Sequence, residues 1–145
     1  MKMDVQGAAL EILQGGTRAT AELVALVTEV DFVPLYKDQP LFADVDSHLR
    51  GRGFMLHKLL GVGGRAAMPV VVGKAKNTPV QFMWADALYV RNVMDAERFT
   101  DETLYRLAVI FDLYYSPDMA HWALREVDRR RGSQLAAAFA RQIVD

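Results

Sequence analysis

Two carboxylates, those of Asp4 and Glu29, follow apolar segments at places where a side chain could do chemistry. Asp4 lies near the end of the short segment Met1–Gln6, just before Gly7, and Glu29 lies in the alternating second half of Leu23–Val33. If both segments are parallel strands, their carboxyl ends meet at one sheet edge, where open α/β sheets bind ligands. The pair could then act as a general base or bind a cation. Alternatively, both are ordinary polar strand ends, and Asp4 accepts hydrogen bonds from the following turn.

Two further residues are candidates for binding a substrate. Asp86 interrupts an apolar strand-like segment that ends at Arg91, and a buried carboxylate there would require a partner such as Arg91 or Lys58. Tyr36 follows Pro34 in a loop, where its ring could cover a pocket or simply anchor the loop. We take Asp86 and Tyr36 as candidate substrate-binding residues.

The sequence offers no pattern typical of a metal or thiol site. It contains no cysteine, which excludes disulfides and thiol catalysis. Its histidines, at positions 48, 57 and 121, are too far apart in sequence to form a recognisable ligand pair. We therefore predict no metal site.

Charge and hydropathy argue against a polyanionic or membrane partner. The formal net charge is −1, so bulk electrostatics favour no nucleic acid. The basic run Arg129–Arg131 lies beside Glu126 and Asp128, as at a solvated helix end. No apolar segment is long enough to span a membrane, and no signal-peptide pattern opens the chain. We expect a cytoplasmic protein.

The elements that must position these side chains alternate between strand and helix patterns, which predicts an α/β sheet with helices on its faces. A glycine-rich segment, Gly61–Pro79, has the wrong spacing for a dinucleotide-binding loop and is predicted to be a mobile loop. The predicted strands are Met1–Gln6, Leu23–Val33, Phe54–Leu60 and Val80–Arg91, and the predicted helices are Ala8–Gln14, Thr17–Glu22, Leu41–Arg52 and those of a helical tail that starts at Thr100.

Several of these segments together resemble the FkbM-type S-adenosylmethionine-dependent methyltransferases. The resemblance extends to about Arg130, and it departs from the family at Ala9, where the family usually has glutamate. The segments that resemble the family are Lys2–Ala8, Thr28–Phe32, Pro34–Tyr36, Leu41–Asp46, Arg52–Phe54 and Trp84–Arg91.

The resemblance implies only part of a class I, Rossmann-like methyltransferase sheet. The family sheet has seven strands in the order 3-2-1-4-5-7-6, and the segments here resemble strands 4, 5, 6 and 7. Strands 1 to 3, which hold the donor, have no counterpart, and Met1 stands where the family has an apolar strand residue. We therefore expect an internal start, a C-terminal half-domain at residues 1–92, and a helical extension at residues 93–145 that packs on it.

The function implied by the resemblance is methyl transfer from S-adenosylmethionine to an oxygen of a small-molecule or sugar-type acceptor. In that setting Asp4 would position the substrate, or a metal as in related enzymes, and Glu29 would share the catalytic role. We do not expect this chain to bind the donor or to be active alone. The alternative is a non-catalytic α/β remnant or a self-associating interaction module.

The first strand also bears on partners. If it normally pairs with an upstream strand, one of its edges is bare in this chain. A bare strand edge tends to pair with another chain. We therefore expect self-association through the exposed first strand.

Overall fold

The computed structural model describes residues 1–66, 69 and 81–143. The chain forms two compact units, Met1–Asn92 and Val93–Asp145. How the helical extension packs stays a prediction. None of the helices in the described part of the chain is both long and apolar enough to cross a membrane.

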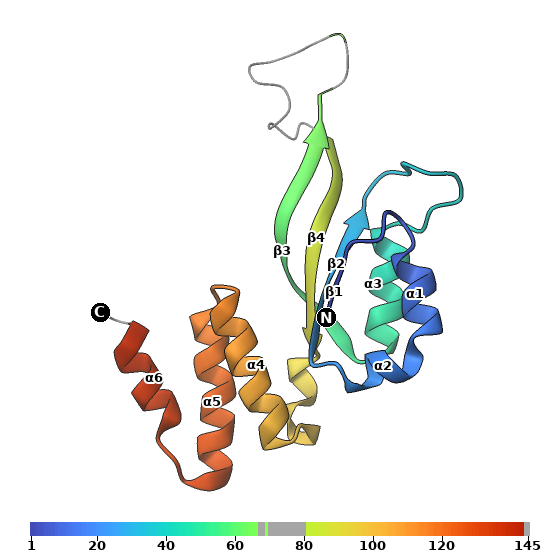
Figure 1. Ribbon diagram of the computed structural model, residues 1–145. Coiled ribbons are helices and arrows are strands. Elements are labelled where there is room, and N and C mark those ends of the chain that lie inside the picture. Colours follow the sequence, from blue (N-terminus) through green and yellow to red (C-terminus); the bar gives the residue numbers. More distant parts are fainter. Residues whose placement is uncertain (67–68, 70–80, 144–145) are drawn as a thin grey trace. The chain divides into compact units, whose positions relative to one another are not determined.

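The first unit is built on a four-stranded mixed sheet (Figure 1). The sheet order is β1-β2-β4-β3, with β1 parallel to β2 and with β4 antiparallel to both of its neighbours. The predicted α/β class is therefore confirmed, with β1 much shorter than the predicted strand. The strands are β1 (Lys2–Met3), β2 (Ala25–Asp31), β3 (Phe54–Arg65) and β4 (Gln81–Arg91).

Three helices accompany this sheet, namely α1 (Ala9–Gly15), α2 (Thr17–Glu22) and α3 (Phe42–Gly51). They lie together on one side of β2 in Figure 1. At the start of α3 the Asp44 carboxylate accepts the Leu41 backbone N–H at 2.8 Å, which satisfies a donor at the helix N-terminus. The core of the unit combines apolar residues of helices and strands, including Met3, Leu13, Leu26, Val30, Val45, Leu49, Phe54, Ala85, Ala87 and Tyr89.

The predicted glycine-rich loop begins later than expected. Strand β3 continues through three glycines to Arg65, so the prediction of a loop from Gly61 was wrong. A Cβ placed on Gly63 would lie 2.1 Å from Cε2 of Trp84, its cross-strand partner on β4. The strand therefore needs glycine here because the indole covers this position. Apart from residues 66 and 69, the rest of the predicted loop lies outside the described residues.

The second unit is helical, as the tail pattern predicted. A 3₁₀ helix that sequence reasoning missed, η1 (Val93–Arg98), precedes α4 (Asp101–Leu113), α5 (Pro117–Arg131) and α6 (Leu135–Ile143). The helix boundaries follow local chemistry. The hydroxyl of Thr100 accepts the Thr103 N–H at 3.1 Å, and Gly132 ends α5 with φ of 68°.

The basic run at the end of α5 ties this unit together. Arg130 donates to the carbonyls of Phe99 at 2.6 Å and of Ala96 at 2.8 Å. Arg131 donates to the Asp101 carboxylate at 2.5 Å, and this hydrogen bond is the main reason why the pKa of Asp101 lies below its usual range. Arg130 is therefore a structural tie and not the solvated side chain that the pattern suggested.

Candidate functional site

Three carboxylates lie in one row across the sheet, and we call Asp4, Glu29 and Asp86 the acidic row. Glu29 of β2 is directly opposite Asp86 of β4 in the antiparallel register, which brings their Cβ atoms to about 5 Å. Met3 pairs with Thr28 in the parallel register, so the residues that follow them, Asp4 and Glu29, lie side by side. Because side chains alternate along a strand and the core takes the neighbouring residues Met3 and Val30, the row faces away from that core.

Glu29 lies at the centre of this row and is electrostatically unusual. Burial raises the pKa of its carboxyl above the ordinary range. Three neighbouring carboxylates raise it further, in decreasing order those of Asp31, Asp4 and Asp86. Since like charges disfavour ionisation, Glu29 holds a proton more readily than an ordinary glutamate. A carboxylate with a raised pKa is a better acceptor for the proton of a bound hydroxyl than an ordinary one.

Asp86, the member of the row on β4, is not the buried carboxylate that its apolar surroundings suggested. Its side chain is 41% exposed, and its Oδ2 lies 3.9 Å from Nζ of Lys2 on β1. The ion pair therefore involves Lys2, and Arg91 is engaged elsewhere. Such an exposed ion pair contributes little to the free energy of unfolding, so its main effect is to place the cation of Lys2 beside the acidic row.

The loop after β2 is tied to the sheet by Gln39. Its Oε1 accepts the backbone N–H of Leu35 at 2.8 Å and that of Tyr36 at 3.0 Å, and its Nε2 donates to Oδ2 of Asp31. We call these four residues the Gln39 clasp. Sequence reasoning singled out neither Asp31 nor Gln39. For Asp31, its place two residues after Glu29, on the same face of β2, was a signal that could have found it.

The clasp connects with the turn that follows β1. The hydroxyl of Tyr36 donates to Oε1 of Gln6 at 3.3 Å, and Nε2 of Gln6 donates to Oδ1 of Asp4 at 3.2 Å. Gln6 and Gly7 have φ values of 48° and 87°, an unusual conformation for a residue other than glycine. Tyr36, whose side chain is exposed, is therefore linked through Gln6 to Asp4.

Nothing in the described residues resembles a metal centre. Within residues 1–66, 69 and 81–143, no three His, Asp or Glu side chains are grouped so that they could hold a metal ion. The arrangement provides the carboxylates of the acidic row as hydrogen-bond acceptors, together with the ammonium of Lys2 and the hydroxyl of Tyr36. These groups can bind and deprotonate a polar ligand.

Comparison with known proteins finds a similarity over the first part of the chain. Residues 1–56 match the family model described as the methyltransferase FkbM domain. The matched segment includes Asp4, Glu29 and Tyr36, whereas Asp86 lies beyond it. Neither the curated proteins nor the solved structures contain a match to this chain.

S-adenosylmethionine, the donor that the matched family implies, has little room at the turn after β1, which is also not the turn to which the resemblance assigns the donor. Close approach of a nucleotide to a backbone turn needs the open space that a glycine leaves. At Gly7 that space is filled, because a Cβ there would lie 3.0 Å from Nε2 of Gln39. This turn therefore offers no donor cradle, and no chemical step through the donor is derived from it.

Proposed function

We propose that this chain is a portion of an S-adenosylmethionine-dependent methyltransferase and that it forms the acceptor side of the site. The acceptor is a hydroxyl of a small molecule or sugar-type compound. The observation that carries this proposal is the position of Glu29, with its raised pKa, between the carboxylates of Asp4 and Asp86. We infer that methyl transfer needs contacts to the donor beyond those of the turn after β1, where a Cβ at Gly7 would meet the Gln39 side chain.

In this proposal each side chain has a separate task. Glu29 takes the proton of the acceptor hydroxyl, which makes that oxygen a better nucleophile. Asp4 and Asp86 accept hydrogen bonds from other hydroxyls of the acceptor, and Tyr36 covers it from the loop. A bound donor would supply the methyl group, and the residues of this chain bind, orient and deprotonate the acceptor.

The sheet order supports the same proposal. If β1, β2, β3 and β4 are strands 4, 5, 6 and 7 of the family sheet, the expected order is 4-5-7-6. The observed order is β1-β2-β4-β3, with β4 antiparallel to its neighbours. The two orders agree. In that sheet, Asp4 and Glu29 stand at the carboxyl ends of neighbouring parallel strands, where open α/β sheets bind ligands.

The proposal predicts that Glu29 titrates at higher pH than the other glutamates. Carbon-13 NMR of the carboxyl groups, followed over pH, measures this directly. In Asp86→Asn the Glu29 titration should move to lower pH, because one repelling charge is removed. Glu11→Gln, at an exposed position of α1 in the same unit, is the matched control and should leave Glu29 unchanged. A Glu29 that titrates with the bulk of the glutamates would remove the basis of the proposal.

The same preparation tests the part played by the donor. Calorimetric titration of S-adenosylmethionine into the chain should show no saturable binding. Micromolar binding would contradict the statement that this chain lacks the donor cradle, and it would assign the whole reaction to it.

A second candidate function is a non-catalytic, self-associating module. The observation that favours it is the place of β1 at the edge of the sheet, paired with β2 alone among the described strands. An edge strand can pair with a strand of a second copy. Sedimentation should then show a dimer fraction that rises with concentration. The dimer fraction should fall when Lys2, whose N–H points away from β2 in the parallel register, is replaced by proline, which cannot donate to a strand ladder. A monomer at all concentrations would exclude this function.

A further inference from the structure

The amide of Gln39 has only one workable orientation. Two backbone N–H groups, of Leu35 and Tyr36, point at one end of the amide, and only its oxygen can accept them. The amide nitrogen must therefore face the carboxylate of Asp31, to which it donates. An uncharged amide combines an acceptor oxygen and a donor nitrogen at the end of one side chain. A glutamate or methionine of similar length cannot replace both contacts.

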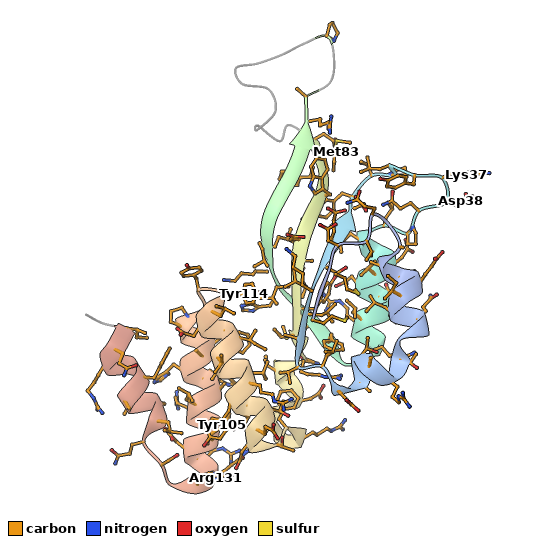
Figure 2. All side chains as sticks on the ribbon, viewed as in Figure 1. Lys37, Asp38, Met83, Tyr105, Tyr114 and Arg131 are labelled. Carbon is orange, nitrogen blue, oxygen red and sulfur yellow. The ribbon has the colours of Figure 1, made fainter. Side chains whose placement is uncertain are left out.

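The middle of the loop, residues 34–38, is exposed. The beginning of the loop is anchored by Phe32, whose ring centroid lies 5.5 Å from that of Phe42 and 6.4 Å from that of Phe82. Figure 2 shows Lys37 and Asp38 at the outer end of the loop, pointing away from the sheet. The Gln39 clasp therefore ties the middle of the loop to β2.

The other end of the clasp is a buried carboxylate. Asp31 is 5% exposed, and its second oxygen, Oδ1, is buried without a hydrogen-bond partner. Burying a carboxylate is costly unless donors compensate it, so the donor supplied by Gln39 matters more than a surface hydrogen bond would. Glu29, on the same face of β2, is electrostatically coupled to Asp31, and Glu29 in turn lies beside Asp4 and Asp86, the latter paired with Lys2.

We propose that Gln39 is a positioning residue for this site. By bridging Asp31 and the loop amides it holds the hydroxyl of Tyr36 at Gln6, and through Gln6 it sets the orientation of the Asp4 carboxylate. Its action on the acceptor rests on the function proposed above. The contacts themselves do not, and they can be tested separately.

The first test removes the bridge. In Gln39→Met, the hydrogen-exchange protection of the Leu35 and Tyr36 amides should fall about tenfold, since each loses its acceptor. The Asp4 carboxyl resonance should shift in the same variant, because its partner Gln6 loses Tyr36. The amide of Phe32, which donates to the Met83 carbonyl at 2.8 Å, should keep its protection and so report an intact sheet.

A swap of the two partners gives a sharper test. In Gln39→Glu, two carboxylates face each other, so loop protection should be lost at neutral pH. It should return as the pH falls and the pair shares a proton, because like charges raise the pKa of the pair. In the double variant Asp31→Asn with Gln39→Glu, the new amide donates to the new carboxylate, and protection should return at neutral pH. Gln14→Met, on the exposed side of α1, is the control and should change nothing.

Several outcomes would overturn the proposal. Unchanged protection of Leu35 and Tyr36 in Gln39→Met would show that Gln39 does not hold the loop. Equal loss at Phe32 would show a general effect on the fold. If the loop amides of the double variant are no more protected than those of Gln39→Glu, Gln39 does not pair with Asp31. If the Asp4 carboxyl resonance does not shift in Gln39→Met, Gln39 does not act on the orientation of Asp4. The Glu29 titration reports the proposed function independently, so the two can fail separately.

Discussion

Replacing Arg91 by lysine is expected to lower the free energy of unfolding of the first unit by about 2–4 kcal/mol. The guanidinium donates to the carbonyls of Leu23 and Arg52, each at 2.8 Å, and of Thr20 at 3.0 Å. It also donates to the carbonyl of Ala21, and it stacks with its carbon 4.2 Å from the centroid of the Phe54 ring. One guanidinium thus joins α2, the connection to β2 and the turn between α3 and β3.

A lysine cannot reproduce these contacts, because a single ammonium cannot reach carbonyls that a planar fork holds apart. Burial already lowers the pKa of Arg91, so a cation with fewer hydrogen bonds there is doubly unfavourable. Urea denaturation, followed by Trp84 fluorescence in a Trp122→Phe background, measures the loss. Arg18→Lys, at an exposed position of α2, should change stability by less than about 0.5 kcal/mol. A similarly small change for Arg91→Lys would show that the carbonyl contacts are not what stabilises this end of the sheet.

Replacing Gly63 by valine is expected to cost about 1–3 kcal/mol, and more if the strand cannot adjust. The new Cβ would lie 2.1 Å from Cε2 and 2.4 Å from Cζ2 of Trp84, so the indole must leave its place. The same denaturation assay measures the loss. The emission maximum of Trp84 should also shift, because the ring moves from its contact with β3.

Gly61→Val is the matched control on the same strand. A Cβ at Gly61 meets nothing within 4 Å, so valine should be tolerated there and could add stability through its preference for strands. If both variants lose the same stability, backbone conformation and not the indole explains the need for glycine. If neither loses stability, Trp84 moves freely and does not fix the register of β3 and β4.

Contacts between residues that are close in sequence determine several of the helix boundaries. The stop of α5 at Gly132, the cap at Thr100 and the helix start at Pro117 involve only neighbours in sequence, and the sequence analysis placed the start of the helical tail at Thr100. Strand β3 was different. Its glycines predicted a loop because glycine disfavours strands, and only the indole from β4 explains why glycine is needed at Gly63.

For the site, the sequence by itself determined that Asp4 and Glu29 stand beside each other. Parallel strands bring their carboxyl ends to one edge of the sheet whatever the details of packing. Polar residues at those ends are therefore enough to predict that the two side chains are neighbours. Only the tertiary structure decided what surrounds them. The antiparallel register with β4 set Asp86 opposite Glu29, and the return of the loop brought Gln39 onto Asp31 and Gly7. These contacts depend on register and loop path, which distant residues fix through packing and which no local pattern encodes.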